Sequence, residues 1–131
     1  MSPEASVISA FVLPSRRERY LGLVETTKGR AKFIDALSHF NEFDPRFKRE
    51  IAPGQQTPAG IESLLRKLGA PDSCWVISEL KAIDGSEMQL GDALRKIVGS
   101  QMGTIVCCVP ETLAYFEGES KRVRYILNNQ K

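Results

Sequence analysis

The segment SELKAIDG, residues 78–85, holds acidic and basic side chains that together could act on a phosphate ester. Glu79 and Lys81 are two residues apart, so on a strand both side chains lie on the same face, and Asp84 follows five residues after Glu79. Carboxylates bind Mg²⁺, and a nearby lysine can position the attacking water or stabilise charge on the phosphate. The spacing predicts a catalytic site of Glu79, Lys81 and Asp84 in a metal-dependent nuclease or phosphohydrolase.

This Glu-x-Lys spacing resembles the catalytic signature of restriction-type nucleases. The preceding acid of that signature would be Asp72, seven residues before Glu79. The gap is too short to place the two acids on separate strands, and the surrounding elements do not alternate as they do in that core. The alternative is a strand that ends in a solvated turn, with charges where the chain emerges. We favour this alternative.

A cluster of basic residues lies between positions 15 and 32. The chain has 18 lysines and arginines against 16 acids, a net charge of +2, so this local excess is its main electrostatic feature. If the two helices expected here are antiparallel, the cations form one patch that could bind a phosphate backbone, with strong salt dependence. A solvated and partly ion-paired surface is the alternative, and we favour it. The cluster consists of Arg16, Arg17, Arg19, Lys28, Arg30 and Lys32.

The only histidine of the chain, His39, lies in the segment SHFNEFDPRF, four residues after Asp35. On one helix face, Asp35 could orient His39 for general-base catalysis, although such pairs are also common on solvated surfaces. Arg46 follows among phenylalanines that either stack on bases or pack a corner between helices. We favour surface pairing and packing. The candidate binding residues are Arg16, Arg17, Arg19, Lys28, Lys32, Asp35, His39 and Arg46.

The three cysteines favour a reducing compartment. They include no CxxC pair, and with one histidine the chain lacks zinc-finger spacing. The apolar run at 7–13 follows an acid instead of basic residues, so we expect no signal peptide, and no segment has the ~20 apolar residues of a membrane span. We therefore expect a cytoplasmic protein without a membrane anchor, bound metal or cofactor.

Capping signals divide the first half of the chain into short helices. A serine-proline start and a later proline predict a helix within 2–14, and the S-x-x-E capping box at 15–18 predicts the start of a second. Apolar spacing predicts a third helix over 28–40, and an Asp-Pro step predicts a brief helical turn within 44–51. A threonine-proline start and a closing glycine predict the clearest helix, over 57–69.

The second half changes to strand-like patterns. Runs of β-branched and aromatic residues predict strands at 74–80, 103–109, 113–119 and 122–127, with a helix at 88–99 inserted among them. The fold class is therefore α+β: an N-terminal run of helices packed on a small, mostly antiparallel sheet of about four strands with one inserted helix. We expect all 131 residues to form one domain.

Glycine-rich phosphate loops, a nucleophile elbow and zinc-protease spacing are absent from the sequence. We therefore favour a protein that acts by binding a protein partner or a second copy of itself over an enzyme. The nuclease with Glu79 and Lys81 and the nucleic-acid-binding module with the basic cluster are the two alternatives.

Overall fold

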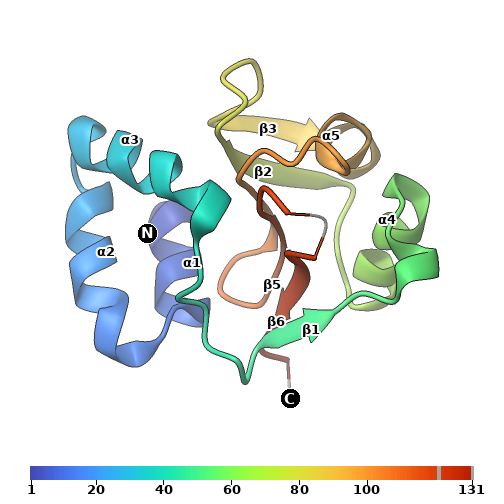
Figure 1. Cartoon of the computed structure of the whole chain (residues 1–131), viewed down its shortest axis with the longest axis horizontal. Coiled ribbons are helices and arrows are strands. Elements are labelled where there is room, and N and C mark those ends of the chain that lie inside the picture. Colours follow the sequence, from blue (N-terminus) through green and yellow to red (C-terminus); the bar gives the residue numbers. More distant parts are fainter. Residues whose placement is uncertain (121, 131) are drawn as a thin grey trace.

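A six-stranded antiparallel sheet forms the centre of the fold (Figure 1). The computed structural model describes residues 1–120 and 122–130. The strand order is β1-β6-β5-β4-β2-β3, and every pair of neighbours is antiparallel. The strands are β1 (Lys48–Glu50), β2 (Ser73–Ser78), β3 (Ser86–Gln89), β4 (Thr104–Val109), β5 (Leu113–Glu117) and β6 (Arg124–Asn128).

Five α-helices occur in the described part of the chain. They are α1 (Pro3–Phe11), α2 (Arg17–Val24), α3 (Thr27–Ala36), α4 (Pro58–Lys67) and α5 (Leu90–Ile97), with short 3₁₀ turns at Pro14–Arg16, Leu37–His39 and Pro53–Gln55. No helix in this part is long and apolar enough to cross a membrane. The predicted α+β class, with helices first and the sheet after, is confirmed.

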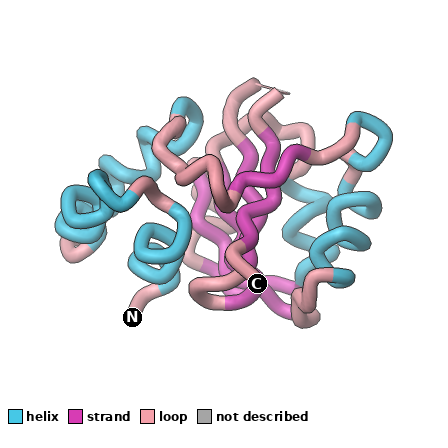
Figure 2. Tube along the Cα trace, turned by 90° about the horizontal axis from the view of Figure 1, so that it is seen from below, coloured by secondary structure: helices cyan, strands magenta, loops and turns pink. Residues whose placement is uncertain are grey.

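Helices cover both faces of the sheet (Figure 2). Ile77, Ile105 and Phe116 lie in one buried cluster with side chains of α1 and α3. Val76 and Val106 lie in a second cluster with side chains of α4 and α5. The central strands are therefore buried on both sides, which explains their nearly continuous apolar sequences.

Residues 1–120 and 122–130 contain six strands instead of the expected four. The two additional strands are the sheet edges: β1, whose three residues are all charged, and β3, where half-buried and exposed positions alternate. Both are too short and polar to give a clear sequence period. For this reason the strand β1 replaces the end of the helical turn expected within 44–51, and the helix expected from residue 88 begins only at Leu90, after β3.

Local capping signals predicted two helix starts correctly and one wrongly. The Ser2 hydroxyl accepts a hydrogen bond from the N–H of Ala5 at 3.1 Å, and the Thr57 hydroxyl accepts one from Gly60 at 3.0 Å. The expected capping box at Ser15 does not form, because the 3₁₀ turn Pro14–Arg16 already includes Ser15 and α2 starts without a side-chain cap. Pro14 favours this earlier start through its fixed φ.

Candidate functional site

A groove of about 700 Å³ lies between α2 and α3, the two helices on the left of Figure 1. Arg19 and Tyr20 contribute to it from α2, and Lys28, Lys32 and Phe33 contribute from α3. The remaining lining is mostly small or aliphatic. The groove therefore combines three cations with a largely uncharged floor.

Close packing at Gly29 forms one end of this groove. Thr26 caps α3 by accepting a hydrogen bond from the N–H of Gly29 at 2.9 Å. A Cβ atom at Gly29 would lie 1.9 Å from the carbonyl oxygen of Leu23, a distance that no side chain tolerates. Glycine therefore lets the first turn of α3 approach the end of α2, and this places Lys28 beside the groove.

The three cations of the groove are exposed and have no acidic partner in the part of the chain that the structure describes. None of the ion pairs among residues 1–120 and 122–130 involves Arg19, Lys28 or Lys32. The guanidinium of Arg19 lies 5.8 Å from the centre of the Tyr20 ring. No acid occurs in the first turn of α3, so the partial positive charge of that helix end adds to the cationic potential.

The other arginines of the basic cluster have partners within the fold. Arg16 lies 3.4 Å from a carboxylate oxygen of Glu42, and the Nε of Arg17 donates to the carbonyl oxygen of Val12 at 2.8 Å. Arg30 forms ion pairs with two acids, described below. The structure thus brings together only half of the predicted patch.

Aromatic rings under the groove pack on one another. The Tyr20 ring makes edge contacts with Phe33 and Phe40, at centroid distances of 5.8 Å and 5.3 Å. Its hydroxyl donates a hydrogen bond to Glu42, and burial together with this carboxylate raises the pKa of Tyr20 to about 12. These rings therefore stabilise the corner between helices, as expected for Phe40.

The predicted catalytic residues line a second hollow, of about 280 Å³, next to α3. Glu79, Lys81, Asp84 and Asp35 all contribute to it. Strand β2 ends at Ser78, so Glu79 and Lys81 lie in the following turn and the expected same-face position on a strand is wrong. An oxygen of Glu79 accepts a hydrogen bond from the N–H of Gly103 at 2.8 Å.

Asp84 is held by a two-pronged ion pair with Arg30. The two guanidinium nitrogens of Arg30 donate to its oxygens at 2.8 Å and 2.9 Å, and the Nε of Arg30 donates to Glu4 at 2.8 Å. Burial raises the pKa of Asp84, but the hydrogen bonds from Arg30 and from the N–H of Ser78 outweigh it and hold the pKa below its ordinary value. Asp84 therefore connects α1 and α3 to the turn between β2 and β3.

Metal ligation is not prearranged in the described residues, which contain no group of three or more histidine, cysteine or acidic side chains able to hold an ion. Asp72, the acid of the nuclease-like signature, forms an exposed ion pair with Arg66 at 2.7 Å.

His39 contacts an acid other than the one expected. Its Nδ1 lies 3.1 Å from an oxygen of Glu119, whereas Asp35 lines the hollow with Glu79. The expected partner is wrong because α3 ends at Ala36 and continues as a 3₁₀ turn, which changes the rotation per residue and breaks the four-residue spacing.

Arg46 forms a local contact at the start of the turn that leads to β1. Its guanidinium lies 2.7 Å from Asp44 and 5.0 Å from the centre of the Phe47 ring. The hydrogen bonds from Arg46 hold the pKa of Asp44 below its ordinary value. The Asp44 carboxylate caps the turn by accepting a hydrogen bond from the N–H of Arg46 at 3.0 Å, and Arg46 lies outside the α2–α3 groove.

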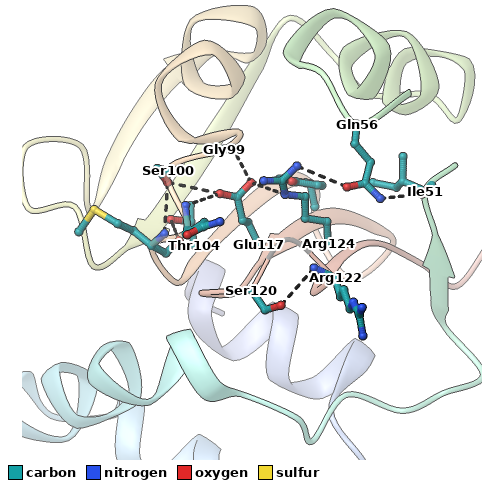
Figure 3. Close-up of polar contacts among 12 residues, drawn as sticks. Ile51, Gln56, Gly99, Ser100, Thr104, Glu117, Ser120, Arg122 and Arg124 are labelled. Atoms are coloured by element: carbon teal, nitrogen blue, oxygen red, sulfur yellow. Dashed lines mark hydrogen bonds and ion pairs between the residues drawn. The ribbon is translucent and has the colours of Figure 1, made fainter. Parts of the chain in front are cut away.

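A buried carboxylate that the sequence patterns did not indicate, Glu117, lies at the centre of a polar network (Figure 3). Glu117 accepts hydrogen bonds from the N–H of Gln101 at 2.9 Å and from the hydroxyl of Tyr115 at 2.9 Å, and it lies 3.5 Å from Arg124 on the neighbouring strand. A usable signal was present: both charged residues lie on strands that are otherwise largely apolar. The network connects the loop after α5 to the middle of the sheet.

No family model, curated protein or solved structure matches the chain. The fold and the groove therefore define its class on their own: an α+β protein with a two-sided antiparallel sheet and a basic groove in its N-terminal helical layer.

Proposed function

We propose that this protein is a cytoplasmic binding protein whose α2–α3 groove receives an acidic segment of a protein partner. The observation that carries the proposal is the set of three exposed cations, Arg19, Lys28 and Lys32, that lack acidic partners within the described chain. Complementary charge guides such a segment to the groove and fixes its orientation. The three free cysteines support the cytoplasmic setting.

Small residues in the groove support a helical or extended peptide as the bound element. Gly22 and Ala36 are exposed in the lining, and a Cβ atom at Gly22 would meet nothing within 4 Å. A partner backbone can therefore approach closely, as amphipathic helices do in apolar grooves. Acidic side chains along one edge of that peptide would pair with Lys28 and Lys32.

The packing of the aromatic rings favours a protein partner over a nucleic acid. Single-stranded nucleic acids stack their bases on exposed aromatic faces beside cations. In this groove Phe33 is only 1% exposed, and Tyr20 is packed against Phe33 and Phe40. Three exposed cations, with one half-buried ring already covered in part by Phe33, Phe40 and Arg19, fit an acidic peptide better than stacked bases.

The test is a binding titration with a defined probe. A fluorescein-labelled 15-residue helical peptide, with glutamates on one face and leucines on the other, is added to the full chain at low salt, and anisotropy is measured. We expect Lys28→Glu/Lys32→Glu to weaken binding by roughly tenfold, because it reverses the charge on one wall of the groove. The matched control is Lys67→Glu/Lys96→Glu, which changes net charge equally on exposed positions of α4 and at the end of α5.

Each outcome supports or rejects the α2–α3 groove as the binding site of an acidic peptide. Equal weakening by both double variants would mean that only net charge attracts the peptide, and the groove would be rejected as its site. The chain could instead bind a 20-base-pair DNA duplex more tightly than the peptide, and Lys28→Glu/Lys32→Glu alone could abolish that binding. This result would favour the nucleic-acid alternative. A concentration-dependent dimer that the groove variant abolishes would identify a second copy as the partner.

A further inference from the structure

A cavity of about 270 Å³ lies where the start of α1 meets the beginning of β2 and the end of β4. Ser6 lines it from α1, Cys74 and Trp75 from β2, and Cys107 and Cys108 from β4. Trp75 is directly opposite Cys107 in the sheet, so the pairing of these two strands fixes the shape of the cavity. Its lining shares no residue with the α2–α3 groove.

The interior of this cavity carries no charge at neutral pH. Burial raises the pKa of Cys74 to about 11 and that of Cys108 to about 12, and it also raises the pKa of Cys107. All three thiols are therefore protonated, and they behave as small apolar groups. The other ionisable groups that the described residues bring to the lining are the Glu87 carboxylate and the α-amino group of Met1, and both residues are exposed at the rim.

Ser6 brings one buried hydrogen-bond donor to the lining. The residue is only 5% exposed, and its oxygen accepts a hydrogen bond from the N–H of Glu111 at 2.7 Å. Among the described residues the hydroxyl proton has no acceptor. The Nε1 of Trp75 is a second buried donor that has no hydrogen-bond partner among the residues described. Unpaired buried donors cost free energy, which an acceptor atom in the cavity would recover.

We propose that this cavity binds a small, neutral, mostly apolar molecule with a single ring and one acceptor oxygen, of the aryl ketone kind. Protonated thiols and prolines contact the ring, and the hydroxyl of Ser6 donates to the oxygen. The volume agrees with this size: an apolar cavity of about 150 Å³ accepts benzene, whereas drug-sized ligands occupy about 300–1,000 Å³. The site is independent of the proposed protein-binding groove.

The probes are acetophenone and ethylbenzene, which have nearly the same shape and differ in the acceptor oxygen. Trp75 is the only tryptophan of the chain, so its indole N–H gives a single reporter resonance in a ¹H–¹⁵N correlation spectrum. We expect acetophenone to shift this resonance saturably and to bind about fivefold more tightly than ethylbenzene. This ratio corresponds to one neutral hydrogen bond, which contributes about 1 kcal/mol. Both probes should also slow alkylation of Cys107.

Two variants separate this cavity from other sites. Ser6→Ala should bring the affinity for acetophenone down to that of ethylbenzene, and Cys107→Phe should fill the cavity and abolish both titrations. Absence of a saturable shift, or titrations unchanged by Cys107→Phe, would overturn the proposal. If Cys107→Phe does not fold, the alkylation rate of Cys107 in the natural chain tests the proposal instead. Alkylation that neither acetophenone nor ethylbenzene slows would overturn the proposal. If Ser6→Ala leaves the ratio of the two affinities, acetophenone to ethylbenzene, unchanged, Ser6 does not donate the proposed hydrogen bond to the ligand.

Discussion

Replacement of Glu117 by glutamine should destabilise the protein more than any surface change of the same size. Glu117 is fully buried, and its two oxygens receive hydrogen bonds from backbone N–H groups of Gly99 and Gln101 and from the hydroxyl of Tyr115. It is also the counter-ion of Arg124, which is 8% exposed. Glutamine keeps the shape but turns an NH₂ group toward these donors and removes the negative charge.

The expected loss follows from the geometry of the network. Removing one partner of a buried ion pair costs about 3–5 kcal/mol, because the other charge stays buried without compensation. The distance of 3.5 Å between Glu117 and Arg124 is long for such a pair, so we expect the lower end, about 3 kcal/mol. Domains of this size have total stabilities of about 5–15 kcal/mol, so the variant should retain its fold with a clearly lower denaturation midpoint.

Urea unfolding followed by circular dichroism measures this loss. Asp92→Asn is the matched control, since it also neutralises an acid paired with an arginine, but on the surface of α5, and should cost well under 1 kcal/mol. The double variant Glu117→Gln/Arg124→Gln should lose less than the sum of the two single losses, because the pair is coupled. A loss for Glu117→Gln below about 1 kcal/mol, or strictly additive effects, would refute the reasoning.

Two further predictions concern the N-terminal helical layer. Gly29→Ala should lower the melting temperature, because the added Cβ would lie 1.9 Å from the carbonyl oxygen of Leu23. Gly22→Ala should raise the melting temperature, because its Cβ meets nothing within 4 Å and alanine stabilises a helix by up to about 1 kcal/mol relative to glycine. Thermal melts that rank the two variants the other way would contradict the packing. The pKa of Asp84 is lower in the folded than in the unfolded chain, so its ion pair with Arg30 contributes stability above about pH 4 that is lost as the pH falls through the folded value. Melting temperatures between pH 5 and pH 2.5 should therefore fall more steeply for the natural chain than for Asp84→Asn, and parallel curves would show that this carboxylate contributes no pH dependence.

Local signals account for the parts of the fold that the sequence predicts well. The caps at Ser2 and Thr57 depend on atoms three residues away, so they are visible in the sequence. The edge strands are not visible, because β1 is a strand only through its pairing with β6, about eighty residues later, and β3 only through its pairing with β2. The class therefore follows from the sequence, while the number of strands depends on distant partners.

The same distinction applies to the candidate site. Counting charges identifies the basic cluster, but it cannot tell which cations remain free, because that depends on acids elsewhere in the chain. Arg30 is paired with Asp84, 54 positions away, whereas Lys28 and Lys32 are not in any described ion pair. Glu117 was missed because strand patterns highlight apolar residues, and the significance of one acid among them appears only when Arg124 lies opposite.

The position of β1 has a consequence for how the chain folds during synthesis. Every other strand in the described part of the chain pairs with at least one strand adjacent to it in the sequence, whereas β1 pairs with β6, which is synthesised only after β2, β3, β4 and β5. The segment of β1 therefore stays unpaired until β6 has been made, and exposed strands in this state can pair with other chains. The sequence Lys48-Arg49-Glu50 is charged throughout, and strands of this kind resist such association. The charged composition that deprives β1 of a strand-like sequence pattern thus protects the nascent chain from association until β6 has been made.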